Sequence, residues 1–124
     1  MIVDVANVMG SRPDGWWRDR AGAAARLAAS VAALAAPGPE AAPGPEAAAY
    51  VLVLEGQARA ATIPPAPGIS VVRAPGSGDD AIASLAGPGD VVVTADRELR
   101  RRVEAAGAVA EGPGWLMRQL RYVR

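Results

Sequence analysis

The sequence predicts an α/β protein with a five-stranded parallel sheet and helices on both faces. Short apolar runs suited to buried strands alternate with stretches that have helical spacing of apolar residues, which is the pattern of strands joined by crossover helices. The strand runs are apolar on both sides, as in a parallel sheet covered on both faces. Right-handed crossovers, with a reversal of direction after the third strand, give the order 3-2-1-4-5.

The first third of the chain predicts one strand and one long helix. Ile2 and Val3 form a short strand that Val5 can extend, and the turn-rich residues 10–15 form a loop. A helix then runs from about Trp16 to Ala35. Its alanines favour the helix, and its larger apolar residues recur at helical spacing: Leu27, Val31 and Leu34.

The middle of the chain predicts a connector and two strands. Residues at about 36–48 hold two copies of Ala-Pro-Gly-Pro-Glu-Ala, which neither a helix nor a strand accommodates well. Residues 50–54 form the second strand. Residues 55–68 form a loop or a short helix, and residues 69–73 form the third strand.

The last third alternates helix and strand with Gly and Pro between them. The helix at about 79–86 begins at a cap supplied by Asp79 or Ser77. The remaining elements are a strand at 90–94, a helix from Asp96 to about Ala106, a strand at 108–110 and a last helix after Gly112. We expect residues 1–124 to form a single domain.

Composition restricts the chemistry. Thirteen arginines balance thirteen acids, and the sequence contains no lysine, cysteine or histidine. Disulfides, thiolate or histidine catalysis and metal sites with Cys or His ligands are therefore excluded. The sequence shows no signal segment and no run of about 18 apolar residues, so a cytoplasmic protein without membrane contact is the expectation.

Three groups of acids fall at or just after predicted strand ends. Asp4 ends the first strand, Asp79 and Asp80 follow the third, and Asp96 follows the fourth. Ligands bind outside the carboxyl ends of such strands, at the point where the strand order reverses. That point lies between the first and fourth strands, so Asp4 and Asp96 should meet there, and one of Asp79 and Asp80 is the candidate to join them. Asp79, Asp80 and Asp96 also have a simpler interpretation as helix caps. Asp90 precedes its strand and should be structural.

Converging carboxylates need a partner of opposite charge. Two carboxylates about 4 Å apart repel by roughly 4 kcal/mol at an effective dielectric constant near 20, so either one acid has a raised pKa or a cation binds. Oxygen ligands without Cys or His point to Mg²⁺ or Mn²⁺, which is suited to phosphodiester hydrolysis. Glu98 is a possible fourth carboxylate or a surface residue in a first helical turn.

Three segments resemble motifs of the PIN-like NYN family, in particular its YacP-like branch. They are Val3-Asp-Val-Ala-Asn-Val8, Ser77-Gly-Asp-Asp-Ala-Ile82 and Val93-Thr-Ala-Asp-Arg-Glu-Leu99. The resemblance implies a PIN-like three-layer α/β/α sandwich and metal-dependent ribonuclease activity. It also implies that Asp4, Asp79 and Asp96 are metal-binding acids, with Asn7 supporting them and Glu98 as a second acid of the last motif. The spacing to Ile82 favours Asp79 over Asp80. The short chain and the connector depart from the family pattern.

Arginine and tryptophan residues provide candidate contacts for single-stranded RNA. The arginines lie along the predicted helix from Asp96 or flank the first loop, and the tryptophans can stack on unpaired bases. The candidates are Arg12, Trp16, Trp17, Arg18, Arg97 and Arg100. The alternative is a solvated helix face with tryptophans covering a sheet edge. Because the net charge is zero, tight RNA binding would call for a partner protein or a homodimer.

The sequence thus predicts a Mg²⁺- or Mn²⁺-dependent nuclease that hydrolyses single-stranded RNA, with Asp4, Asn7, Asp79, Asp80 and Asp96 as candidate catalytic residues. Two alternatives stay open. One is a nucleotide phosphohydrolase or pyrophosphohydrolase that uses the same acids. The other is a non-catalytic RNA-binding or regulatory module of the same fold.

Overall fold

A computed structural model describes residues 1–12, 15–35 and 50–120. Its centre is a five-stranded sheet, and all four strand pairs are parallel. The strands are β1 (Ile2–Asp4), β2 (Tyr50–Leu54), β3 (Ile69–Arg73), β4 (Val91–Val93) and β5 (Val109–Glu111). Their order is β3-β2-β1-β4-β5, which confirms the predicted topology. The predicted connector at about 36–48 lies outside the described residues.

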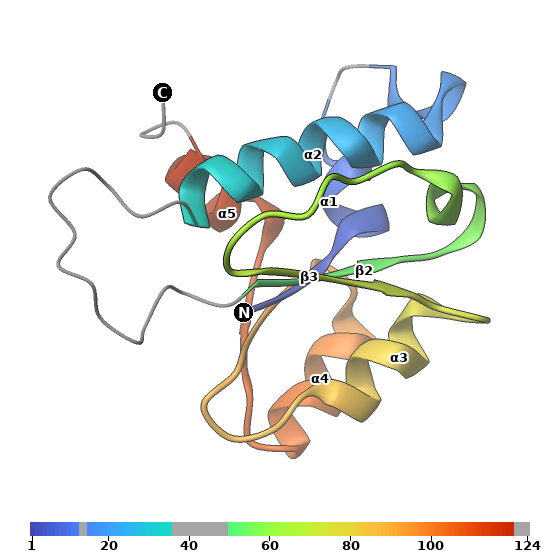
Figure 1. Cartoon of the computed structure of the whole chain (residues 1–124). Helices are drawn as coiled ribbons and strands as arrows, with labels where there is room; N and C mark the ends of the chain where they lie inside the picture. Colours follow the sequence, from blue (N-terminus) through green and yellow to red (C-terminus); the bar gives the residue numbers. More distant parts are fainter. Residues whose placement is uncertain (13–14, 36–49, 121–124) are drawn as a thin grey trace, which may run out of the picture.

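Helices cover both faces of the sheet and give the three layers seen in Figure 1. On one face lie α1 (Val5–Gly10), α2 (Arg20–Ala35) and α5 (Pro113–Leu120), and on the other lie α3 (Gly78–Leu85) and α4 (Arg97–Ala105). Two short 3₁₀ helices, η1 (Trp16–Arg18) and η2 (Gly56–Ala60), lie between these elements.

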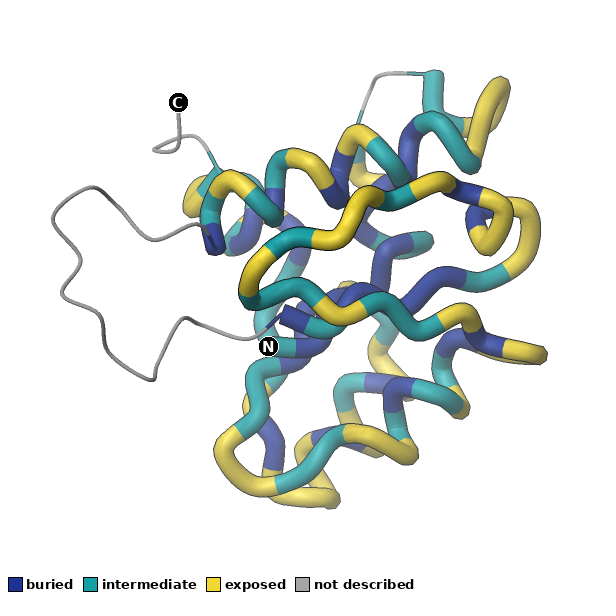
Figure 2. The backbone as a smooth tube through the Cα atoms, in the orientation of Figure 1, coloured by how far each residue is buried: buried dark blue, intermediate teal, exposed yellow. Residues whose placement is uncertain are grey.

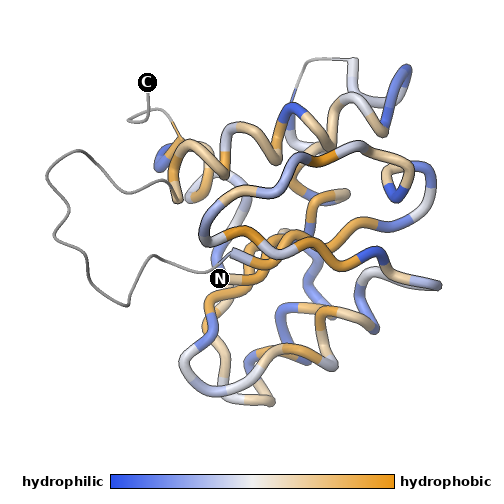
Figure 3. Tube along the Cα trace, in the orientation of Figure 1, coloured by the Kyte–Doolittle hydropathy of each residue, from blue (hydrophilic) through white to orange (hydrophobic). Residues whose placement is uncertain are grey.

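Alternation along β1 decides where Asp4 points. Side chains on a strand project alternately to the two faces. Val3 belongs to the apolar core beneath α2, and Ile2 belongs to the core beneath α3 and α4. Asp4 therefore projects to the same face as Ile2, next to the start of α3. The buried and apolar segments in Figures 2 and 3 gather at the middle of the sheet, where β1, β2 and β4 are mostly buried, whereas the edge strands β3 and β5 are intermediate or exposed.

The N-terminal segment differs from the prediction in two places. Val5 is the first residue of α1 and not an extension of the strand, and α1 itself is a helix that the sequence does not predict. The predicted helix from Trp16 to Ala35 is divided at Asp19, which has an extended backbone (φ −153°). The carboxylate of Asp19 accepts a hydrogen bond of 2.9 Å from the Gly22 N–H, so this acid caps the start of α2.

The C-terminal half agrees with the prediction to within one or two residues at each boundary. Ser77 caps α3 by accepting hydrogen bonds from the N–H groups of Asp79 and Asp80 at 3.1 and 3.4 Å. Asp90 accepts from the Gly87 N–H at 2.9 Å, ahead of β4 and away from the carboxyl ends of the strands. No helix in the described ranges is long and apolar enough to cross a bilayer.

Candidate active site

A polar hollow of about 290 Å³ lies outside the carboxyl ends of the central strands. Four carboxylates line it, together with an amide and a hydroxyl side chain. The lining residues are Asp4, Ala6, Asn7, Glu55, Ser77, Asp79 and Asp96. The acids come from the ends of β1 and β2 and from the residues after β3 and β4, which is where a sheet of this order places its ligand site.

Asp4 is the most buried acid of the hollow, with an exposed fraction of 4%. It ends β1 and also caps α1, since its Oδ1 accepts from the Asn7 N–H at 3.4 Å. Its Oδ2 accepts from the Thr94 hydroxyl at 2.9 Å. Burial raises the pKa of Asp4 to about 6, with smaller contributions from the charges of Asp79 and Glu55, while the two hydrogen bonds act against this rise.

Asn7 and Thr94 connect the first strand to the fourth at the edge of the hollow. The side-chain carbonyl of Asn7 accepts from the Ala95 N–H at 2.8 Å. The Thr94 hydroxyl donates to Asp4 and accepts from the Asp96 N–H at 3.2 Å. These bonds fix the backbone of residues 94–96 relative to Asp4. The sequence reasoning did not single out Thr94, although its place between an apolar strand and an acid was visible.

Asp96 caps α4 and also lines the hollow. Its Oδ1 accepts from the Leu99 N–H at 2.9 Å, which is the geometry of a helix N-cap. The interpretation of Asp96 as a cap and its place among the converging acids are therefore compatible. The cap also fixes the orientation of the carboxylate, because one of its oxygens is held at the helix start.

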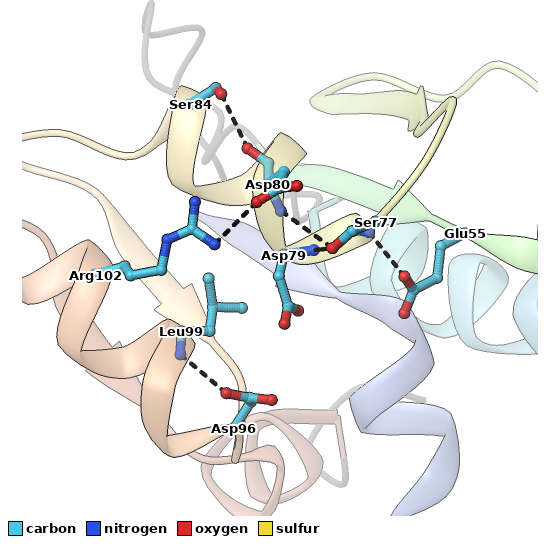
Figure 4. A network of polar contacts seen from close by, with 9 residues as sticks. Glu55, Ser77, Asp79, Asp80, Ser84, Asp96, Leu99 and Arg102 are labelled. Atoms are coloured by element: carbon cyan, nitrogen blue, oxygen red, sulfur yellow. Dashed lines mark hydrogen bonds and ion pairs between the residues drawn. The ribbon is translucent and has the colours of Figure 1, made fainter.

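Asp79 and Asp80 point in different directions from the first turn of α3, as Figure 4 shows. Asp79 lines the hollow with Asp96 and Glu55 on either side. Desolvation raises the pKa of Asp79, and the charges of Asp96 and Glu55 add to this, while Arg102 acts against it. Asp80 is exposed and forms an ion pair of 3.0 Å with Arg102.

Glu55 is the acid that the sequence reasoning missed. It follows β2 directly, as Asp4 ends β1, and its Oε2 accepts from the Gly78 N–H at 2.7 Å. A Cβ added at Gly78 would lie 3.0 Å from Glu55 Oε2, so a larger residue there would require the Glu55 carboxylate to move. The signal that identified the other acids, a carboxylate at a strand end, applies equally to Glu55.

The donor set of the hollow fits a hard cation by its chemistry. Its side chains offer carboxylate, amide and hydroxyl oxygens, which Mg²⁺ and Mn²⁺ prefer. Within residues 1–12, 15–35 and 50–120, however, no three acidic side chains are grouped so that they could hold a metal ion as they stand. Ligation by three acids would require their side chains to turn toward a common centre.

The remaining candidates on α4 lie outside this hollow. Arg97 and Glu98 are exposed in the first turn of α4 and do not line it. Arg100 donates to the carbonyl oxygens of Thr94 and Ala110 at 3.3 and 3.5 Å. Its guanidinium therefore fastens the ends of β4 and β5 to each other.

The tryptophans form an aromatic cluster with neighbouring arginines. The rings of Trp16 and Trp17 meet edge to face with centroids 6.0 Å apart. The guanidinium groups of Arg20 and Arg18 lie over Trp16 and Trp17, at 5.3 and 5.8 Å from the ring centroids. Trp17 is 56% exposed, whereas Trp16 packs partly against the core. Arg12 is half-buried, and its backbone N–H donates to the Met9 carbonyl at 3.1 Å.

Comparisons with known proteins support the fold. No family model matches the sequence. UPF0178 proteins from three strains of Xanthomonas oryzae pv. oryzae are 43% identical over 65 residues, 52% of this chain and 40% of theirs. The match therefore spans less than half the length of these relatives. The crystal structure of a variant of Rae1 (YacP) from Bacillus subtilis superposes with a TM-score of 0.68, covering 97% of this chain and 73% of that one at 15% identity. The chain thus has the PIN-like α/β fold that its sequence predicts.

Proposed function

We propose that this chain is a metal-dependent ribonuclease that hydrolyses phosphodiester bonds of single-stranded RNA. The observation that carries the proposal is the convergence of four carboxylates from four strand ends on one polar hollow. The fold shared with Rae1 (YacP) agrees with the PIN-like fold that the motif resemblance implies. The motif resemblance points to Asp4, Asp79 and Asp96 as the acids concerned.

Asp4, Asp79 and Asp96, joined by Glu55, are the residues that would hold Mg²⁺ or Mn²⁺. When bound, such a cation lowers the pKa of an attacking water and neutralises charge on the phosphate. The chain's own contribution is orientation. Asn7 and Thr94 hold the backbone beside Asp4 and Asp96 in place through the hydrogen bonds described above.

Proton release should accompany metal binding. Asp4 has a pKa of about 6, so part of the population carries a proton on this side chain at mildly acidic pH. A cation competes with that proton, because carboxylate ligands must be deprotonated. Metal affinity should therefore rise with pH and level off above about pH 7.

The adjacent acids Asp79 and Asp80 provide a matched test of the proposal. We expect Asp79→Asn to lower the rate of cleavage of a labelled single-stranded RNA, in Mg²⁺ or Mn²⁺, by about 100-fold or more, since one missing electrostatic contact to the transition state commonly costs that much. Asp80→Asn should stay within about threefold of wild type, because it removes only an exposed ion pair.

Asp96→Asn extends the test, since Asn keeps the helix cap while removing the charge. Equal loss in Asp79→Asn and Asp80→Asn, or full activity in Asp79→Asn and Asp96→Asn, would overturn this assignment of the site. Release of phosphate or pyrophosphate from nucleotides with RNA left intact would favour the phosphohydrolase alternative. Absence of a Mn²⁺ site tighter than millimolar, with RNA bound but uncut, would favour a binding module.

A further inference from the structure

A second groove adjoins the acidic hollow, and Glu55 is the one acid of the described residues that lines both. It has a volume of about 360 Å³, at the lower end of the range for small-molecule sites. Side chains of α1, η1 and the start of α2 form one wall, and the residues after β2 and β3 form the other. Its principal lining residues are Ala6, Met9, Trp16, Arg20, Glu55 and Gly76.

The groove and the hollow share a border. Ala6 and Glu55 line both of them, so a chain that crosses the acidic hollow can continue into the groove without leaving the surface. The character of the surface changes at this border. Beyond Glu55 the acids give way to an indole ring, a thioether and a guanidinium group, contributed by Trp16, Met9 and Arg20.

Trp16 and Arg20 bring two planar groups together on one wall of the groove. The guanidinium of Arg20 lies over the Trp16 ring at 5.3 Å from its centroid. Arg20 is exposed and Trp16 is only partly buried, so ligands in solution can reach the pair. Unpaired bases stack on aromatic rings and on arginine guanidinium planes. The cationic group beside the ring also attracts the phosphate that accompanies each base.

Gly76 keeps the groove open. A Cβ built at this position meets no atom within 4 Å, and the residue does not have a positive φ. The backbone at Gly76 therefore tolerates a larger residue, and because Gly76 lines the groove, we expect a leucine side chain there to take up part of the groove's volume. The glycine is therefore not required for the turn that precedes α3.

We propose that this groove is a nucleotide subsite, which holds one unpaired base of single-stranded RNA against Trp16 and Arg20 while the adjoining phosphate lies in the acidic hollow. The inference rests on the proposed ribonuclease function for its choice of ligand. It specifies which part of the substrate the protein recognises, namely an unstacked base next to the reacting phosphate. The site therefore selects single strands, because a base inside a duplex cannot enter it.

Binding without metal and without cleavage tests the subsite separately from the activity. The probe is a hexamer of adenosine ribonucleotides, titrated in EDTA against proteins that carry Asp79→Asn, with affinity measured by calorimetry and tryptophan fluorescence. In this background Gly76→Leu should weaken binding by roughly 5- to 150-fold, the range expected for loss of one stacked base. The matched control is Gly87→Leu, at a glycine that also has open space around its Cβ and no positive φ, but lies before β4.

A hexamer with one abasic position locates the base. In the protein that carries Asp79→Asn alone, one abasic position should weaken hexamer binding by about the same factor as Gly76→Leu does. In the protein that also carries Gly76→Leu, the abasic position should cause no further loss of affinity, because the subsite is already blocked. Trp16→Leu should reproduce the effect of Gly76→Leu, and Trp16→Phe should restore most of the affinity. This second pair keeps the test valid if Gly76→Leu does not fold.

The outcomes separate the subsite from the nuclease. Equal affinity of Gly76→Leu and Gly87→Leu for the hexamer, or equal affinity of Trp16→Leu and Trp16→Phe, would overturn the subsite even if RNA is cut in Mn²⁺. Hexamer binding that depends on Gly76 and Trp16, in a protein that never cuts RNA, would uphold the subsite and contradict the ribonuclease.

Discussion

Asp4 has three roles at the scale of a single residue. It closes β1, caps α1 and accepts a hydrogen bond from Thr94, while it lies almost entirely out of contact with solvent. A buried carboxylate is expensive to ionise. The raised pKa of Asp4 is therefore a measure of the stability that the protein gives up when it holds this charge without a cation.

Replacing Asp4 by Asn should stabilise the metal-free protein at neutral pH. The pKa of Asp4 rises from 3.8 to about 6 on folding, so the folded state binds more protons in this window and stability falls as pH increases through it. We expect Asp4→Asn to exceed wild type in free energy of unfolding by up to about 3 kcal/mol at pH 7.5 and to match it near pH 3.5.

Urea denaturation in EDTA at the two pH values measures this difference. Asp90→Asn, at the other edge of the sheet, serves as a control that should show no comparable gain. A lower stability of Asp4→Asn at pH 7.5 would mean that Asp4 acts mainly as a hydrogen-bond acceptor and that its charge costs little.

The hydrogen bond from Thr94 should lower the pKa of Asp4. The Thr94 hydroxyl donates to the Asp4 carboxylate and lowers the pKa of that group. Thr94→Val keeps the shape of the side chain and removes this donor, so the pKa of Asp4 should move above about 6 and stability should fall by about 1–3 kcal/mol. Thr94→Ser retains the hydroxyl and is the control. An NMR titration of the Asp4 carboxyl carbon would reveal the shift, and an unchanged pKa in Thr94→Val would refute it.

At the scale of elements, α3 carries Asp79 into the hollow by means of its first turn. Ser77 fixes that turn by capping the N–H groups of Asp79 and Asp80.

Ser77→Ala should lower the free energy of unfolding by about 1 kcal/mol. Because the turn that carries Asp79 is then no longer fixed, the protein that stays folded should also bind Mn²⁺ more weakly than wild type. Ser84→Ala is the control on the same helix, since the Ser84 hydroxyl only donates to the Asp80 carbonyl. Thermal melts and Mn²⁺ titration of both variants give the comparison, and equal Mn²⁺ affinity would show that the cap does not position Asp79.

The elements that the sequence predicted well are those with strong local signals. Apolar runs placed all five strands, and the Gly87-Pro88-Gly89 break separated α3 from β4. Helix α1 is not among the predicted elements, because the sequence marks Asp4 as the end of a strand, although an acid before a short helix is also a cap. The division of the helix at Asp19 was missed for the same reason.

The candidate site was only partly predictable for a geometric reason. The convergence of Asp4, Asp79 and Asp96 at one edge of the sheet follows from the strand order. That order depends only on right-handed crossovers and one reversal of direction. The separate directions of Asp79 and Asp80 follow from how α3 is rotated against the sheet, because successive residues on a helix point about 100° apart. That rotation depends on packing, for example of Ile82 in the core, and local sequence does not determine it.

At the scale of the whole molecule, a net charge of zero sets the strength of non-specific RNA binding. Among the described residues no arginine lines the hollow, and two arginines of α4 are already engaged, Arg100 with backbone carbonyls and Arg102 with Asp80. Each phosphate neutralised adds roughly 0.7 to the slope of log affinity against log salt for a single strand. We expect a slope of magnitude no greater than about 2 for short single-stranded RNA, measured by fluorescence anisotropy between 50 and 300 mM KCl. A slope of 4 or more would indicate a broader basic surface.

The position of β1 in the middle of the sheet has a consequence for how the protein acquires its structure. Val3 pairs with Leu52 on one side and with Val93 on the other, so β1, which precedes the other four strands in the sequence, gains its second neighbour only when β4 has been made. Until β4 emerges from the ribosome, one edge of β1 has no strand to pair with, and the sheet can form only between β1, β2 and β3. Such non-local pairing slows folding, and it means that Asp4 meets Asp96 only after all the residues between them have been made.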